Sequence, residues 1–197
     1  MTLYDKSQDA ERLLAEDHAA LAELLDGLIA SLNAGNATEA FARLDLIWAR
    51  LAMHIRAENL HLFPSILNVL EAGSSKGADV SPSLAEANEA IARLGSDHNF
   101  FMHELADLIK TMREVQLEPF TQETTKQLST VRQRIVSLGS RLEKHNELEE
   151  ELVYRWPGRL LDESQQARLT EQVLQEIENF PPRFISSRNG SEKDADS

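Results

Sequence analysis

Residues 145–149 read HNELE and residues 54–58 read HIRAE, so in both segments a histidine precedes a glutamate by four positions. Residues four apart lie on the same face of an α-helix, so each segment presents an imidazole and a carboxylate to the same neighbour. A lone histidine precedes each segment along the chain, in the Asp-His pairs at 17–18 and 97–98. Burying six such groups without a partner would be very costly. The doubled pattern therefore predicts a helical protein whose core holds metal ions.

Four long segments surround these residues and carry apolar side chains at alternating steps of three and four. Their apolar seams extend over residues 14–32, 44–61, 84–112 and 128–156. This spacing is typical of helices packed side by side. Polar residues replace the expected leucine or isoleucine at six seam positions, which are His18, His54, Glu58, His98, His145 and Glu149. The pattern predicts an all-α fold, an up-down-up-down four-helix bundle.

Turn and capping signals separate the four segments. The sequence NAGN at 33–36 can close the first helix. A Gly/Ser-rich loop at 73–82 follows the second helix, and its final proline is expected in the first turn of the third helix, next to a capping box at 83–86. The Glu-Pro pair at 118–119 is expected to end the third helix, and Trp-Pro-Gly at 156–158 the fourth.

The chain beyond the four seams divides into two further parts. A shorter amphipathic stretch at about 162–180 predicts a fifth helix, packed against the outside or one end of the bundle. The remainder is rich in Ser, Asn, Asp and Lys, so we expect it to be disordered. The expected organisation is a bundle with a dinuclear metal site at 1–160, an accessory C-terminal helix at 161–180 and a disordered tail at 181–197.

Composition excludes several classes of function. The 197-residue chain has no cysteine, which excludes disulfides, thiolate metal sites and cysteine nucleophiles. Its 33 acidic and 20 basic residues give a formal net charge of −13, a poor match for nucleic acid or an anionic membrane. The N-terminus lacks the features of a secretory signal, and no run approaches the ~18 apolar residues of a membrane-spanning helix. We therefore expect a soluble cytoplasmic protein that partners neither nucleic acid nor membrane.

The six polar seam residues form a ligand set for two metal ions. In an up-down-up-down bundle the second and fourth helices run in the same direction, so their His-x-x-x-Glu pairs can face each other at one level. The lone histidines of the first and third helices complete the ring. Two carboxylates can then bridge two cations, and neutral imidazoles add donors without adding charge. Mixed nitrogen and oxygen ligation favours iron, and manganese, zinc or copper are also compatible.

Other histidines and acids near the set have several interpretations. His61 continues the second seam and is an additional ligand, a proton donor or a structural residue that supports the ligands. His103 is predicted to face away from the site. Asp17 and Asp97 either hydrogen-bond to the ligands or act as solvated or interhelical carboxylates. Within the acidic run at 147–151, only the predicted ligand has the phase of the seam, so its neighbours are predicted to lie on a solvated face.

At these residues the sequence resembles the hemerythrin-like proteins, also called HHE cation-binding domains. The matching stretches are EDHAAL at 16–21, HIRAENLHLFP at 54–64, SDHNFF at 96–101 and HNELEEELVY at 145–154. The resemblance implies a four-helix bundle with a non-haem di-iron centre that is oxo-bridged or hydroxo-bridged when oxidised. By position, the four histidines would be terminal ligands and the two glutamates would be the bridges.

The chain departs from the oxygen-carrying hemerythrins in two ways. Those proteins have a second histidine four residues after the one on the third helix, where this chain has Met102. They also bridge from the fourth helix with an aspartate at a different spacing from that of Glu149. The four-histidine, two-glutamate set looks instead like the bacterial branch tied to nitric oxide, oxidative stress and iron–sulfur repair. The repair proteins usually carry a cysteine-bearing N-terminal domain, and this chain has no cysteine.

Three functions follow as hypotheses. The leading one is a di-iron protein that binds or reacts with dioxygen, nitric oxide or peroxide, in sensing or stress protection, with a possible redox or regulatory protein partner. The second is an iron-handling or iron-sensing protein whose metal-dependent fold is read by a partner. The third is a metal-free helical interaction module. No nucleophile–base arrangement, phosphate loop or organic-cofactor motif is present in the sequence, so no enzyme class is assigned.

Overall fold

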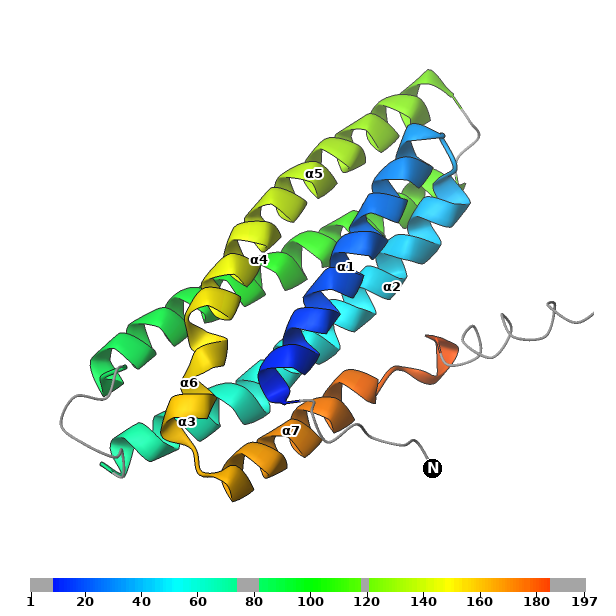
Figure 1. Ribbon diagram of the computed structural model, residues 1–197. Helices are drawn as coiled ribbons and strands as arrows, with labels where there is room; N and C mark the ends of the chain where they lie inside the picture. The colour runs from blue at the N-terminus through cyan, green and yellow to red at the C-terminus, as the bar shows by residue number, and fades with distance from the viewer. Residues whose placement is uncertain (1–8, 74–81, 118–120, 185–197) are drawn as a thin grey trace, which may run out of the picture.

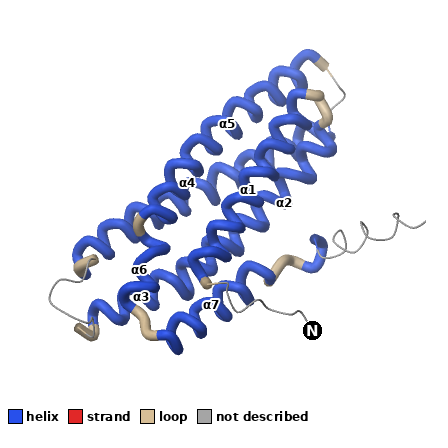
Figure 2. The backbone as a smooth tube through the Cα atoms, viewed as in Figure 1, coloured by secondary structure: helices blue, strands red, loops and turns tan. Residues whose placement is uncertain are grey.

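The structure of the protein, a computed structural model, describes residues 9–73, 82–117 and 121–184. Over these ranges the chain forms helices joined by short turns and has no strands (Figure 2). The all-α prediction is confirmed. None of the described helices is long and apolar enough to cross a membrane.

Four long helices form the body of the described structure (Figure 1). They are α1 (Ala10–Asn33), α2 (Ala37–Ala57), α4 (Leu84–Leu117) and α5 (Gln122–Glu151). Helix α1 packs against α2 and α5, and α4 packs against the same two helices, so the four close into a ring. The leucines of the first predicted seam are all buried inside this ring.

The connections agree with most of the predicted breaks. Gly35 takes the left-handed conformation, with φ of +69°, in the turn between α1 and α2. Ser83 and Glu86 form the predicted reciprocal contacts at the start of α4, because the amide of Ser83 donates to Glu86 at 2.8 Å and the amide of Glu86 donates to the Ser83 hydroxyl at 3.3 Å. The helix begins at Leu84, so Pro82 precedes the cap and does not lie in the first turn as predicted. Helix α4 ends at Leu117, and the predicted stop at 118–119 lies outside the described residues.

The second seam continues past α2 through an irregular turn. A π-helical turn, η1 (Glu58–Leu62), joins α2 to α3 (Phe63–Glu71), and the amide of Phe63 donates to the carbonyl of Glu58, five residues earlier. Pro64 follows directly and has no amide hydrogen to donate, which disrupts the regular ladder at this point. A π turn adds about one residue to a helical turn, so the residues after Glu58 are rotated relative to the predicted seam.

The fourth long helix ends earlier than predicted. Helix α5 stops at Glu151 and is followed by a 3-10 turn, η2 (Val153–Arg155), and by the short helix α6 (Trp156–Leu160). Leu152, a predicted seam residue, has non-helical φ and ψ angles of −124° and −67° and is 41% exposed. The expectation of one continuous helix to Trp156 was wrong, because the chain turns at Leu152.

The predicted fifth helix is α7 (Glu163–Glu178), which begins at an Asp162 cap and packs against α1, α2 and the π turn (Figure 1). Leu169 and Val173 on its inner face are buried. Of the segment predicted to be a disordered tail, residues 181–184 are described, and Arg183 there pairs with Asp45 at 3.1 Å. The rest of that prediction, from residue 185, lies outside the described residues.

Two hydrophobic clusters fill the interior, and the six polar seam residues lie between them. On α1, Leu14 belongs to one cluster and Leu21 to the other, with His18 between them. On α4, Leu94 and Phe101 are divided in the same way around a second candidate histidine. The polar groups therefore sit in an apolar environment on both sides, where electrostatic interactions are much stronger than in water.

Candidate metal centre

The structure brings all six predicted ligands together in the interior of the helical ring. Each is at most 4% exposed, and the set is His18, His54, Glu58, His98, His145 and Glu149. The contacts among them join α1, α2, the π turn, α4 and α5. The prediction that these residues converge is therefore met by the geometry.

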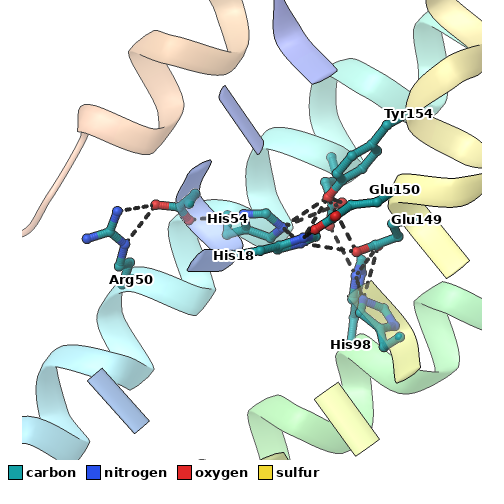
Figure 3. Close-up of polar contacts among 10 residues, drawn as sticks. His18, Arg50, His54, His98, Glu149, Glu150 and Tyr154 are labelled. Atoms are coloured by element: carbon teal, nitrogen blue, oxygen red, sulfur yellow. Dashed lines mark hydrogen bonds and ion pairs between the residues drawn. The ribbon is translucent and has the colours of Figure 1, made fainter. Parts of the chain in front are cut away.

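The first half of the site is the imidazole pair of His18 and His54 (Figure 3). Their Nε2 atoms face each other at 3.0 Å. Glu149 places Oε2 3.3 Å from the Nε2 of His18, and Glu58 places Oε1 3.6 Å from the Nε2 of His54. Two nitrogens and two carboxylate oxygens from separate parts of the chain thus point at one another.

The second half is the imidazole pair of His98 and His145, whose Nε2 atoms lie 3.2 Å apart. Here Glu58 contributes its other oxygen, Oε2, at 3.2 Å from the Nε2 of His98. Glu149 contributes Oε1, at 3.1 Å from the Nε2 of His145 and 3.6 Å from that of His98. Each carboxylate therefore directs one oxygen to each imidazole pair, which is the arrangement expected of bridging ligands.

An aspartate and an arginine stand behind one histidine in each half. Asp17, which is 2% exposed, accepts from the Nδ1 of His54 at 3.0 Å and from Arg50 at 2.7 Å. Asp97 lies 3.5 Å from the Nδ1 of His145 and accepts from Arg141. Of the two interpretations of these aspartates, Asp17 fits the one in which it supports a ligand.

The two arginines were missed by the sequence analysis, although the sequence contains a signal for them. Each precedes its histidine by four residues, so the repeated unit is Arg-x-x-x-His-x-x-x-Glu at 50–58 and 141–149. That spacing places the arginine on the same helical face as the ligands, one turn further along.

Glu150 corrects the prediction that the neighbours of Glu149 lie only on a solvated face. Its side chain is 44% exposed, yet its Oε1 accepts from the Nδ1 of His18 at 2.7 Å (Figure 3). The contact crosses from α5 to α1. No periodicity within α5 reveals it, because it depends on how closely the two helices pack.

Tyr154 is a further residue that the sequence analysis missed. Its ring points into the site (Figure 3), the residue is 1% exposed, and its hydroxyl donates to Oε1 of Glu58 at 2.6 Å. Tyr154 follows Glu149 by five residues, so in a continuous helix its side chain would point about 140° away from that of Glu149. The break at Leu152 and the 3-10 turn redirect it into the site.

The two remaining histidines lie outside the cluster. His61 is turned toward α7, where its Nε2 lies 3.8 Å from Oε2 of Glu176. Its contacts support the structural interpretation, because the π turn rotates it off the seam that carries Glu58. His103 is exposed and contacts the backbone carbonyl of Asn99 at 2.7 Å, so it faces away as predicted.

The protonation of the cluster follows from burial and mutual charge. Burial opposes protonation of His54 and His98. Glu58 and Asp17 nevertheless raise the pKa of His54 well above its usual value, and Glu149 and Glu58 raise the pKa of His98 to about 9. Burial likewise opposes ionisation of Glu149, but hydrogen bonds from the surrounding histidines hold its pKa well below the usual range. In the absence of a metal, protons on the histidines therefore offset the negative charge of the two buried glutamates.

The hydrogen bonds at Nδ1 show that a cation fits the centre. Carboxylates can only accept, so the Nδ1 atoms of His18 and His54 must both carry the hydrogen in these contacts. In the neutral form both Nε2 atoms then present lone pairs to each other at 3.0 Å. Only a proton or a metal ion between such groups removes the repulsion, and deprotonated imidazole nitrogen and carboxylate oxygen are ordinary metal ligands.

Two groups of atoms are close enough to hold an ion each. They are the sets His18, His54 and Glu149, and His98, His145 and Glu149, in which the ligand atoms lie within 4.8 Å of one another. Oε2 of Glu58 and Oε1 of Glu149 are also buried, and they face the Nε2 atoms of His98 and His145 at 3.1 to 3.6 Å. Where these imidazoles are neutral and Nε2 carries no hydrogen, such contacts bring buried acceptors together, which is costly, so the residues present fit a bound metal.

Two surface pockets reach the site from opposite halves. One, of about 680 Å³, lies between α1 and α5 and reaches His18 and Glu150. The other, of about 460 Å³, lies between α2 and α4 and reaches His98. Both imidazole pairs are therefore close to solvent although their own atoms are buried.

Comparison with known families agrees with the geometry of the site. The model of the hemerythrin HHE cation binding domain matches residues 9–157, which include all four long helices and all six candidate ligands. Searches of curated proteins and of solved structures found no match. The family match covers most of the chain, and the histidines and glutamates of the predicted ligand set are buried together within the matched residues. The chain therefore belongs to the hemerythrin HHE cation binding domain family.

Proposed function

We propose that this protein is a non-haem di-iron protein of the four-histidine, two-glutamate branch and that it binds or reacts with dioxygen, nitric oxide or peroxide, in sensing or stress protection. We infer that its four long helices form an up-down-up-down bundle around this centre. One observation carries the proposal: four Nε2 atoms and four carboxylate oxygens converge in an apolar interior, with the Nδ1 atoms of His18 and His54 already committed to carboxylates. Mixed nitrogen and oxygen ligation favours iron over thiolate-preferring metals.

Each part of the chain has a defined task in this proposal. The imidazoles donate nitrogen without adding charge, and the two glutamates offset the charge of two cations. Asp17 and Glu150 hold their histidines in the tautomer that leaves Nε2 free to ligate. The hydrophobic clusters on both sides keep bulk water away from the ligand atoms. When bound, the two irons would supply one-electron redox chemistry and coordination positions for a small molecule.

Metal content tests the ligand assignment. Protein purified without chelators and reconstituted anaerobically with ferrous iron should contain close to two irons per chain by inductively coupled plasma mass spectrometry. Alanine at any one of the six ligand positions should lower the metal content, because each group contacts at least two others. His103→Ala is the matched control and should keep both irons. Equal iron retention in all seven variants would contradict the assignment.

A second candidate function, iron sensing through a partner protein, is supported by the packing of α7. Glu176 of this helix pairs with Arg56 at 2.6 Å and lies 3.8 Å from His61, and these two residues flank Glu58. We treat α7 as an accessory helix whose docking responds to metal at the adjacent ligand. Anaerobic iron removal should then expose α7 to proteolysis. Equal cleavage of α7 in the iron-loaded and metal-free proteins would contradict iron sensing and leave binding of, or reaction with, a small molecule as the proposed function.

A further inference from the structure

The hydroxyl oxygen of Tyr154 occupies a position that differs from that of an ordinary supporting hydrogen-bond donor. It lies 2.6 Å from Oε1 of Glu58 and 3.3 Å from Oε2 of Glu149. It also lies 3.1 Å from the Nε2 of His18 and 3.3 Å from that of His54. The contact with Glu58 is the shortest, but the oxygen is also within 3.3 Å of three further atoms. Each of these four atoms is a candidate ligand atom of the same metal position.

These separations match the edges of a coordination polyhedron. Nitrogen and oxygen ligands bind such metals at about 2.1 Å, so neighbouring ligand atoms at right angles lie about 3.0 Å apart. The two histidine nitrogens of this half are 3.0 Å apart, and the nitrogen of His18 is 3.3 Å from Oε2 of Glu149. The Tyr154 oxygen lies in the same range, at 3.1 to 3.3 Å, from the Nε2 atoms of His18 and His54 and from Oε2 of Glu149, and it is closer, at 2.6 Å, to Oε1 of Glu58. The phenolic oxygen, two imidazole nitrogens and one carboxylate oxygen thus stand at ligand-to-ligand spacing around one position.

The second imidazole pair, His98 and His145, has phenylalanine neighbours in place of a tyrosine. Phe63 stacks on His98 with ring centroids 6.1 Å apart and an interplanar angle of 9°. Phe101 meets His145 edge-on, with centroids 5.2 Å apart. Neither phenylalanine offers a ligand atom, whereas a pocket reaches each half of the site, at His18 and at His98. The two halves of the site, alike in histidines and carboxylates, therefore differ at this point.

We propose that Tyr154 is a fifth protein ligand of the cation held by His18 and His54, and that the position held by His98 and His145 is the one left open for a small molecule. The inference rests on the proposed di-iron function and deepens it. Ligation forms a bond from the phenolic oxygen to the cation, breaks the O–H bond and releases one proton to solvent. A bound cation lowers the pKa of a coordinated acid and favours this deprotonation. In the metal-free protein the same hydroxyl donates to Glu58.

Optical spectroscopy of the ferric protein tests the ligand directly. A phenolate bound to ferric iron gives a visible charge-transfer band with phenolate ring modes in its resonance Raman spectrum. The ferric wild-type protein should show both signals. The Tyr154→Phe protein should lose both signals, whether it keeps two irons per chain or loses the iron held by His18 and His54. The matched control is Tyr4→Phe, which changes the only other tyrosine of the chain and should keep both signals.

The outcomes separate this inference from the proposed function. Two irons per chain without phenolate modes in the wild-type protein would overturn the tyrosine ligand and leave the di-iron function intact. Absence of iron after reconstitution of the wild type would overturn the function itself. If Tyr154→Phe fails to fold, wild-type protein grown with ring-deuterated tyrosine decides the question. Raman modes that shift with deuteration support ligation, and modes that do not shift contradict it.

Discussion

Three of the four candidate ligand histidines have a carboxylate beside Nδ1, and these contacts decide which ring nitrogen is available to a metal. Glu150 and Asp17 accept from their histidines at 2.7 and 3.0 Å, whereas Asp97 lies at 3.5 Å. Asp17 is held further by Arg50, and burial, which opposes its ionisation, is outweighed by His54 and Arg50, so its pKa lies below the usual value. It therefore stays ionised behind its ligand.

Replacing this carboxylate should weaken metal binding without removing a ligand. Asp17→Asn keeps the shape of the side chain but removes its charge, so the His54 tautomer and ring orientation are held less firmly. We expect metal affinity to fall about 10-fold to 100-fold, measured by competition with a chromogenic chelator. Asp97→Asn is the matched variant in the other half and should have a smaller effect, because its contact is longer and its side chain is 17% exposed. Equal losses of metal affinity in the two variants would contradict the stronger supporting role assigned to Asp17.

At the scale of helices, the irregular segments are as important as the regular ones. The π turn begins at Glu58, and α5 ends two residues after Glu149, so each His-x-x-x-Glu helix changes course just beyond its carboxylate. On α2 the change turns His61 away from the centre. Beyond α5 it brings Tyr154 in. Irregular turns of this kind are frequent at functional sites.

Helix α7 depends on its first residues as well as on its apolar face. Asp162 accepts from the amide of Gln165 at 2.8 Å, and the Gln165 side chain accepts from the amide of Asp162 at 2.9 Å. Asp162→Ala should lower the free energy of unfolding by about 1 kcal/mol, because it removes the cap from this short helix. Chemical denaturation followed by circular dichroism measures this change. Asp162→Asn can still cap and should retain most of the stability, and a similar loss in both variants would contradict the capping role.

At the scale of the whole molecule, the buried charges link stability to pH. In the metal-free protein the pKa values of His54 and His98 are raised above their unfolded values, so they contribute stability that is fully present below about pH 6.5. That contribution is lost as pH rises through about 9, the folded value for His98. The pKa values of Glu58 and Glu149 are lowered, so their contribution is present above about pH 4.5 and is lost as pH falls through their folded values.

The metal-free protein should therefore be most stable between about pH 4.5 and 6.5 and should lose stability toward pH 9. For His98 alone the change corresponds to roughly 3 kcal/mol. Urea denaturation at pH 5 to 9.5 measures it. His98→Ala should flatten the alkaline decline, whereas His103→Ala should not. The metal-loaded protein should lack the decline, because ligation keeps the imidazoles neutral at every pH where the metal is bound. An equal decline with and without metal would contradict this account.

Most of the described fold could be predicted from the sequence, because apolar periodicity and capping residues act locally. The seam of α1 is buried as predicted, and the cap at 83–86 forms as predicted. The break at Leu152 could not be predicted in the same way. Trp-Pro-Gly at 156–158 was predicted to end the helix, but α5 ends at Glu151 and these three residues lie within α6. Tyr154 and Trp156, between the two helices and at the start of α6, are buried in the hydrophobic cluster next to the site.

By itself, the sequence determined the helical fold and the six polar residues that meet inside it, since both follow from spacing along single helices. Tertiary structure alone decided what surrounds them: Glu150 against His18, Tyr154 between two glutamates, and His61 turned toward α7. The physical reason is that periodicity gives the face of a helix on which a residue lies. The atom that meets it from another helix depends on how the helices pack and on where each of them is interrupted.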